Sequence, residues 1–317
     1  MRVGTSMKLV VTGSIAYDYL MSFPGKFTEH FLPEHMKRVS LSFLVDSMDK
    51  RRGGCAPNIA YTLALLGEKP YLMATAGQDF SDYKAWMEAV NIDTSLVKVI
   101  DGKFCASFFC STDQDNNQIA SFYTGAMANA GELSMRTVAG IKDSLVIIAA
   151  NDPNGMVQWA EECAAMGVKY IWDPGQQCAR MEGPQLKSGI SGAFMVIVND
   201  YEFELIRQKT GLSEADVLTQ APLLVITKGE KGCTIHTKDG TEDVAAVTPD
   251  RIADPTGVGD AFRGGFMKGL AMGAPYATCG QLGSVAATYA LEHLGGTSHA
   301  YTWDEFRRRY EVHFGSL

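Results

Sequence analysis

The stretch from residue 254 to 262 reads Asp-Pro-Thr-Gly-Val-Gly-Asp-Ala-Phe, and its residue types and spacing suit the handling of a negative charge. Gly257 and Gly259 flank one apolar residue, Val258, and the carboxylate of Asp260 follows at once, where a helical pattern (261–272) continues. Glycine lets backbone N–H groups approach a ligand closely, and the N-terminus of a helix attracts negative charge. The amides of residues 257–259 are therefore predicted to form an anion hole.

Asp260 gives this predicted anion hole a second chemical function. A carboxylate would repel a phosphate, so binding alone does not explain its position. It is explained if Asp260 takes a proton from a hydroxyl while the amides stabilise the phosphoryl group under attack. The alternative is that Asp260 only stabilises the helix dipole beside a tight glycine turn. The sequence has no Gly-X-X-X-X-Gly-Lys-Ser/Thr loop, so the phosphates need another cradle. We expect an ATP-dependent kinase that acts on an alcohol, with Asp260 as the general base.

Short apolar runs alternate with helical patterns in the middle of the chain. The runs lie at residues 145–149, 170–173, 194–198 and 223–227, and the helical patterns at 156–166, 201–209 and 215–220. Such an order predicts an α/β fold with a mostly parallel sheet covered on both faces. Ligands bind beyond the carboxyl ends of such strands. We therefore expect the polar residues at these ends to face one cleft: Asn151, Asp152, Asp173, Asn199 and Thr227.

Two regions depart from the alternating pattern. Residues 104–124 resemble a hairpin, with strands at 105–110 and 119–123 around a turn-rich segment, and residues 39–46 are expected to supply another strand. We predict one domain, residues 1–317, with a small β lid built from about 14–50 and 104–125. The alternative is an edge hairpin whose aromatic residues pack on the main body.

The composition narrows the class of protein. A formal net charge of −8 argues against a nucleic-acid partner. The seven cysteines are scattered without a Cys-X-X-Cys pair, which is typical of reduced thiols. Residues 8–13 read as a first strand, and no apolar run is long enough to span a membrane. We expect a cytoplasmic protein without a membrane partner.

Four separated motifs, in order along the chain, resemble those of the ribokinase-like (PfkB) carbohydrate and nucleoside kinases. They are Gly-Gly-Cys-Ala-Pro-Asn-Ile-Ala at 53–60, Asn-Asp-Tyr-Glu at 199–202, Thr-Lys-Gly-Glu-Lys-Gly at 227–232 and the run at 254–260. The resemblance implies a ribokinase-like three-layer fold with a mostly parallel central sheet and a small β lid. It also implies that ATP and Mg²⁺ are the cofactors.

The resemblance assigns residues to the phosphate side of the site. It implies that Asn199 and Glu202 organise the magnesium shell through water, although the same spacing also suits an N-cap and its capping box. The nucleotide is expected at Thr227, Gly229 and Gly232. Asp254 and Thr256 match positions that contribute to a monovalent-cation site in many relatives, so K⁺ is a further candidate.

The resemblance also assigns residues to the substrate side. Asp18 resembles the carboxylate that grips two sugar hydroxyls, and Asn58 would hydrogen-bond such hydroxyls. Gly53 and Gly54 would let the backbone approach a sugar ring, the alternative being a loose turn before a helix. Four further residues are expected at the nucleobase. By resemblance, Gln176 and Gln177 border the substrate site. The rings of Phe108 and Phe122 would stack on a purine, the alternative being that they only pack.

Within the family, these details are most similar to bacterial adenosine kinases. The expected reaction is transfer of a phosphoryl group from ATP to the 5′-hydroxyl of adenosine, which gives AMP and ADP. The nearest alternative is a sugar kinase of the same family with ribose or a fructose-type substrate. A nucleoside sensor without catalysis is a second alternative. An NAD-dependent dehydrogenase is disfavoured because no Gly-X-Gly-X-X-Gly follows the first strand.

Arg263 has three possible partners: ATP phosphates, the cleft or a surface carboxylate. A homodimer through the lid is expected by resemblance only.

Overall fold

The structure is a computed structural model that describes residues 7–31 and 40–317. Its centre is an eight-stranded sheet with the order β14-β13-β12-β11-β10-β9-β1-β4. The strands from β4 to β12 in that order run parallel, whereas β13 is antiparallel to both of its neighbours. The strands are β1 (Lys8–Thr12), β4 (Tyr71–Met73), β9 (Ser144–Ile148), β10 (Lys169–Trp172), β11 (Met195–Asn199), β12 (Leu223–Thr227), β13 (Cys233–Thr237) and β14 (Gly240–Val244).

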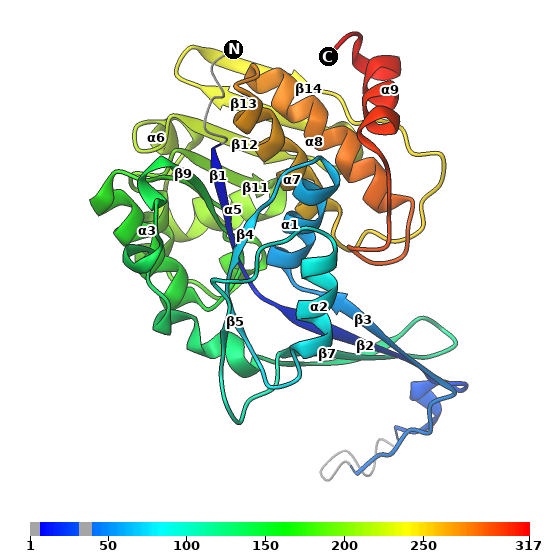
Figure 1. Ribbon diagram of the computed structural model, residues 1–317. Helices are drawn as coiled ribbons and strands as arrows, with labels where there is room; N and C mark the ends of the chain where they lie inside the picture. Colours follow the sequence, from blue (N-terminus) through cyan, green and yellow to red (C-terminus); the bar gives the residue numbers. More distant parts are fainter. Residues whose placement is uncertain (1–6, 32–39) are drawn as a thin grey trace.

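Helices cover both faces of this sheet (Figure 1). Successive side chains of a strand point to opposite faces, so apolar residues of the buried strands need a covering layer on each side. Leu145 and Ile147 of β9 pack in one hydrophobic cluster with residues of α1 and α7, while Val146 and Ile148 pack in another with residues of α3. The first face carries α1 (Cys55–Leu65), α2 (Ser81–Ala89) and α7 (Val258–Met272). The second carries α3 (Pro153–Met166), α4 (Gly183–Ile190), α5 (Asp200–Thr210) and α6 (Glu214–Leu218). The predicted three-layer α/β fold with a mostly parallel sheet is confirmed.

The C-terminal helices extend the first layer. Helix α8 (Tyr276–Leu291) packs along α7, and α9 (Trp303–Phe314) packs on α8. A separate cluster of buried residues, which includes Val285 and Phe306, lies between them. No helix among the described residues is long and apolar enough to cross a bilayer.

A second, four-stranded sheet, here called the small sheet, projects from the main body (Figure 1). Its order is β3-β2-β7-β8, with strands β2 (Ala16–Ser22), β3 (Ser47–Gly53), β7 (Ala106–Thr112) and β8 (Gln118–Tyr123). Strands β7 and β8 form the predicted antiparallel hairpin. A short pair, β5 (Thr75–Ala76) and β6 (Lys98–Val99), completes the strands of the described residues.

The prediction of a strand at residues 39–46 is wrong. The strand that pairs with β2 is β3, at Ser47–Gly53, whereas described residues 40–46 form no strand and Val39 lies outside the described residues. The apolar pattern there serves an aromatic cluster instead, since the ring of Phe43 lies 5.0 Å from Phe23 and 4.9 Å from Phe27. Strand β3 is an edge strand with charged residues, a composition that apolar patterning does not detect.

The register of the small sheet places four side chains on one face. Asp18 lies opposite Phe108, and Phe108 lies opposite Phe122. Arg51 of β3 lies opposite Asp18 on the other side of β2. Because paired residues of neighbouring strands point to the same side of a sheet, these side chains share one face. That face borders the cavity described next.

Candidate active site

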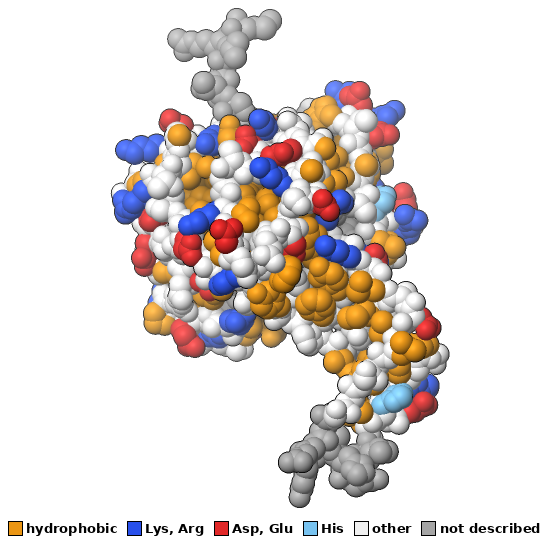
Figure 2. All heavy atoms as spheres, turned by 60° about the horizontal axis from the view of Figure 1, so that its bottom comes forward, with side chains coloured by type: hydrophobic (Ala, Val, Ile, Leu, Met, Phe, Trp, Pro, Cys, Tyr) orange, Lys and Arg blue, Asp and Glu red, His pale blue; other side chains and the backbone are white. Residues whose placement is uncertain are grey.

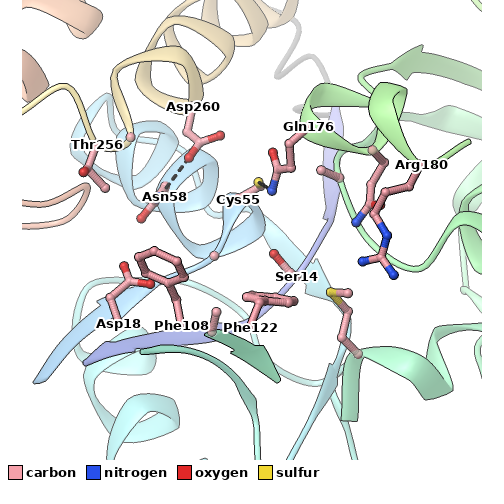
Figure 3. Close-up of a pocket in the computed structure, with 16 residues that line it drawn as sticks. Ser14, Asp18, Cys55, Asn58, Phe108, Phe122, Gln176, Arg180, Thr256 and Asp260 are labelled. Carbon is pink, nitrogen blue, oxygen red and sulfur yellow. Dashed lines mark hydrogen bonds between the residues drawn. The ribbon is translucent and has the colours of Figure 1, made fainter. Parts of the chain in front are cut away.

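One cavity, here called the main cavity because most of the predicted substrate residues line it, lies between the small sheet and the N-terminal ends of α1 and α7 (Figure 3). Its volume is about 530 Å³. Its lining includes Ser14, Asp18, Gly54, Cys55, Asn58, Phe108, Phe122, Met127, Gln176, Gln177, Arg180, Thr256, Gly257 and Asp260.

A smaller cavity of about 190 Å³ adjoins the main one. Its lining includes Asp173, Asn199, Glu202, Thr227, Gly259 and Arg263. Both cavities are also lined by Cys55, Ala150, Gln176, Gly257 and Asp260. Asp260 therefore stands where the two cavities meet.

The position of Asp260 follows from how α7 begins. Gly257 is the N-cap with φ of +76°, a left-handed conformation that favours glycine. A side chain there would also place its Cβ 2.6 Å from the Cα of Gly296. Val258, Gly259 and Asp260 form the first turn, whose N–H groups lack carbonyl partners within the helix. The N–H of Val258, however, donates to the Pro255 carbonyl at 3.3 Å. The Val258 amide, which belongs to the predicted anion hole, therefore already has a hydrogen-bond partner within the loop.

The carboxylate of Asp260 accepts a 2.8 Å hydrogen bond from Nδ2 of Asn58 on α1 (Figure 3). Burial raises the pKa of Asp260 to about 7, and the nearby carboxylates of Asp173 and Glu202 act in the same direction. The hydrogen bond from Asn58 and the positive charge of Arg263 lower it only in part. A carboxyl group whose pKa lies near neutrality is suited to proton transfer.

Three of the four predicted sugar-binding residues, Asp18, Gly54 and Asn58, line the main cavity, and Gly53 lies against Asp18 without lining it. Asp18 and Gly53 are in contact distance, because a Cβ on Gly53 would lie 2.6 Å from Oδ2 of Asp18. Gly54 is the N-cap of α1 with φ of +98°, and a Cβ there would collide with the Ser14 carbonyl. Asn58 is buried, and its Oδ1 has no hydrogen-bond partner among the described residues. The structure brings these four predicted residues together.

The predicted base-binding residues line the same cavity. Figure 3 shows the rings of Phe108 and Phe122 on the small-sheet side and Gln176 near Cys55, with Nε2 of Gln176 4.0 Å from the Cys55 sulfur. Gln177 is 4% exposed, and its Oε1 has no partner among the described residues. An unpaired buried acceptor is costly, so the amide of Gln177 is available to a ligand.

Asn199 and Glu202 line the smaller cavity, and they also form the capping box of α5. Asn199 Oδ1 accepts from the N–H of Glu202 at 2.7 Å, and Glu202 Oε2 accepts from the N–H of Asn199 at 2.8 Å. The N-cap interpretation of this spacing is confirmed, and the magnesium role stays a prediction. Burial raises the pKa of Glu202. Its carboxylate, beside the hydroxyl of Thr227 and the carboxylate of Asp260, gives the cavity the oxygen donors that Mg²⁺ prefers.

Not every polar strand end reaches the cavities. Asp173, Asn199 and Thr227 line the smaller one, as expected. Asn151 and Asp152 instead serve the start of α3: Oδ1 of Asn151 accepts from the N–H of Asp152, whose own carboxylate caps the helix by accepting from Asn154 and Gly155. The prediction that these two residues face the cleft is wrong, because their side chains form hydrogen bonds at the start of α3 instead.

Of the two glycines expected at the nucleotide, one has a clear packing role. Gly232 has φ of +83°, and a Cβ there would collide with the Val244 carbonyl of the neighbouring strand. Gly229 has φ of +58° and open space around the position of a Cβ. Neither lines the two cavities described above.

The expected monovalent-cation site does not fit the residues present. Asp254 accepts hydrogen bonds from the N–H groups of Thr256 and Gly295, each at 2.9 Å. Nη1 of Arg51, on β3, lies 3.3 Å from its carboxylate. Although desolvation raises the pKa of Asp254, the hydrogen bonds and Arg51 outweigh it, and the pKa is lowered. A guanidinium thus already supplies positive charge at Asp254, where K⁺ would be repelled.

Several lining residues were not singled out from the sequence. Ser14, Cys55, Met127 and Arg180 line the main cavity. Cys55 stands inside the 53–60 motif, which offered a signal, whereas the sequence around Met127 and Arg180 has no motif. Arg263 lies in the cleft, one of its three expected places. It is buried, lines the smaller cavity and pairs with Asp173 instead of a surface carboxylate.

Comparison with known proteins places this geometry in a family. The family model described as pfkB family carbohydrate kinase matches residues 8–303. A nucleoside kinase of Burkholderia thailandensis, solved in complex with inosine, is 41% identical, with 97% of this chain and 98% of that chain covered and a TM-score of 0.85. The same protein solved in complex with ADP-inosine is 42% identical, with 97% and 96% covered and a TM-score of 0.84. A nucleoside kinase of Methanocaldococcus jannaschii is 29% identical over 98% of this chain and 99% of its own length.

Proposed function

The chain belongs to the pfkB family of carbohydrate kinases and is a ribokinase-like kinase of a nucleoside or sugar. We propose that it phosphorylates the 5′-hydroxyl of a purine nucleoside, with adenosine as a substrate. One observation carries the proposal. Asp260 lies between a cavity large enough for a nucleoside and a smaller cavity lined by phosphate-site residues. A kinase needs its base between acceptor and donor.

The proposed step is an in-line transfer. The carboxylate of Asp260 takes the proton of the 5′-hydroxyl as the oxygen forms a bond to the γ-phosphorus of ATP. The bond between that phosphorus and the β,γ-bridging oxygen breaks, and its electron pair leaves with ADP. The N–H groups of Gly257, Gly259 and Asp260 stabilise the charge on the transferring phosphoryl oxygens.

Magnesium fits the donor set of the smaller cavity. Glu202 and Asn199 would hold it through water, and Thr227, with Gly229 and Gly232 behind it, would border the nucleotide. When bound, the ion neutralises phosphate charge. The residues of the chain then have two tasks, which are to hold the phosphates and to keep Asp260 ready to take a proton.

Asp18 and Asn58 are proposed to bind the ribose. Asp18 accepts from two hydroxyls, and burial raises its pKa, so hydrogen bonds from a ligand would stabilise the charged form. The phenyl rings of Phe108 and Phe122 would stack on the base, with Gln176 and Gln177 at its edge. Inosine in the complexes of the Burkholderia thailandensis relative supports a purine nucleoside. The alternative is a free sugar.

The small sheet is proposed to act as a lid over this cavity and to exclude water during transfer. Its exposed apolar side chains, which include Met48, Phe109, Ile119 and Tyr123, support the further proposal of a homodimer through it. Figure 2 shows hydrophobic side chains gathered on this projecting part of the molecule.

The test is a substrate panel. ADP release is measured with adenosine, inosine, cytidine, ribose and fructose at equal concentrations, with 5′-phosphorylated product identified by mass spectrometry. We expect the purine nucleosides to give the highest kcat/KM. A preference for free sugars would reject the nucleoside assignment, and binding of nucleosides without ADP release would support a sensor instead.

A further inference from the structure

Arg263 connects the start of α7 to the central sheet. Its guanidinium is buried, and Nη2 donates to Oδ1 of Asp173 at 2.6 Å while Nε donates to the other carboxylate oxygen. Asp173 directly follows β10. The remaining nitrogen, Nη1, donates to the carbonyl of Gly259 at 3.0 Å. One side chain thus joins a strand end to the first turn of the helix that carries Asp260.

The Gly259 carbonyl belongs to the same peptide unit as the N–H of Asp260. A trans peptide is planar, so its C=O and N–H point in opposite directions, and holding one fixes the other. A donor on the carbonyl also polarises the unit and makes its N–H a stronger donor. The contact from Arg263 therefore acts on the amide that the proposed function places against the phosphoryl group.

The absence of a side chain at position 259 leaves room for the same contact. A Cβ there would lie 2.9 Å from Nη1 of Arg263. Any larger residue would push the guanidinium away from the carbonyl. Leaving room for this contact is a second role of Gly259, beside close approach to a phosphate.

We propose that Arg263 is a positioning residue for phosphoryl transfer: anchored by Asp173, it orients and polarises the Gly259–Asp260 peptide unit so that the Asp260 N–H faces the transferring phosphoryl group. The inference rests on the proposed function and deepens it. Nη2 also lies 4.0 Å from Oε2 of Glu202, so the same guanidinium links the anion hole to the proposed magnesium shell.

Lysine cannot replace this arrangement. A guanidinium presents its donors in a planar fork, which lets it bind both oxygens of Asp173 and a third acceptor at once. An ammonium keeps the charge but acts as a point donor. Arg263→Lys therefore removes the orientation of the peptide unit while it retains the positive charge beside Asp173.

The experiment compares R263K and G259A with R309K. Arg309 makes a similar two-pronged ion pair with Glu292, at 2.7 and 2.6 Å, between α9 and the end of α8, away from both cavities. The measurements are kcat, the KM of the nucleoside, the melting temperature, and the affinity for ADP plus aluminium fluoride and nucleoside, which mimics the transition state.

We expect R263K and G259A each to lower kcat by about 100-fold or more, the size seen when one anion-hole donor is lost. The affinity for the aluminium fluoride complex should fall by the same factor, while the KM of the nucleoside stays within about threefold. R309K should lower the melting temperature and leave kcat within about twofold. If R263K does not fold, G259A keeps the test open because it displaces the guanidinium without removing it.

Two results would overturn the inference: an R263K or G259A enzyme with nearly normal kcat, or losses of kcat that track the melting temperature in R263K and R309K alike. A failure of the proposed function looks different. In that case the wild-type enzyme transfers no phosphoryl group to any nucleoside or sugar.

Discussion

Nδ2 of Asn58 on α1 and Oδ2 of Asp260 on α7 lie 2.8 Å apart, although 202 residues separate them in the chain. The hydrogen bond orients the carboxylate and favours its charged form, which is the form that can take a proton. The 53–60 motif and the 254–260 motif thus meet in one contact. The sequence predicts that Asn58 binds the sugar alone, and the structure adds this contact to the proposed base.

Asn58→Ala should lower kcat by about 10- to 100-fold, because a misplaced base loses proton-transfer geometry. It should also raise the pKa of Asp260 further, since the hydrogen bond that lowers it is gone. The acid limb of the kcat profile would then move to higher pH. Asn154→Ala, on α3 away from the cavities, is the control. An unshifted acid limb would contradict this role.

Asp260→Asn should lower kcat by about 10²- to 10⁴-fold, the contribution of a general base. The nucleoside dissociation constant, measured by calorimetry, should change little, because the ribose contacts are proposed at Asp18 and Asn58. Asp304→Asn on the exposed surface of α9 is the matched control. Turnover close to wild type would exclude Asp260 as the base.

The pH profile of kcat/KM should lose activity below about pH 7, where Asp260 becomes protonated. The groups that act on this pKa are Asp173 and Glu202, which raise it, and Asn58 and Arg263, which lower it. A profile that stays flat from pH 5.5 to about 8 would be incompatible with this base.

The same shift predicts a stability effect with a definite sign. The folded-state pKa of Asp260 is raised, so the stability it contributes is complete below its unfolded value of 3.8 and is lost as pH rises through about 7. Asp260→Asn should therefore stabilise the fold by up to about 4 kcal/mol at pH 8 and by less at pH 5. Thermal unfolding at both pH values measures the difference, and a destabilised variant at pH 8 would contradict it.

Phe122→Ala should raise the KM for purine nucleosides by about 10-fold or more, because stacking of a base on an aromatic ring contributes about 1–3 kcal/mol. Activity on ribose, where detectable, should not change. Phe109→Ala is the control, since Phe109 alternates to the opposite face and stacks on Tyr19 at 4.7 Å between ring centroids. Equal effects of the two variants would argue for packing instead of base binding.

Potassium should have little effect on turnover, because Arg51 already supplies positive charge at Asp254. We expect kcat in K⁺ and in tetramethylammonium buffers to agree within about twofold. Arg51→Gln removes the guanidinium and should lower kcat in tetramethylammonium, with partial recovery in K⁺. A wild-type enzyme that requires K⁺ would show that the cation binds despite Arg51.

The parallel sheet could be predicted because its signals are local. Leu145 to Ala149 and Leu223 to Thr227 are continuous apolar runs, as strands buried on both faces must be, and the observed β9 and β12 coincide with them to within a residue. The start of α7 could also be predicted, because glycine is favoured where a helix begins with a positive φ, as Gly257 does at the N-cap. Strand β3 escaped prediction because an exposed edge strand needs no apolar pattern.

The kind of site could be predicted from local patterns: glycines at a helix start, a carboxylate in its first turn, and polar residues at the ends of buried strands. These are properties of neighbouring residues, and backbone conformation depends chiefly on neighbours. The partners follow from the packing of the folded chain, namely Asn58 for Asp260, Asp173 for Arg263 and Arg51 for Asp254. Each pair joins segments 90 or more residues apart, and which of many charged side chains meet over such separations is set by how the layers pack.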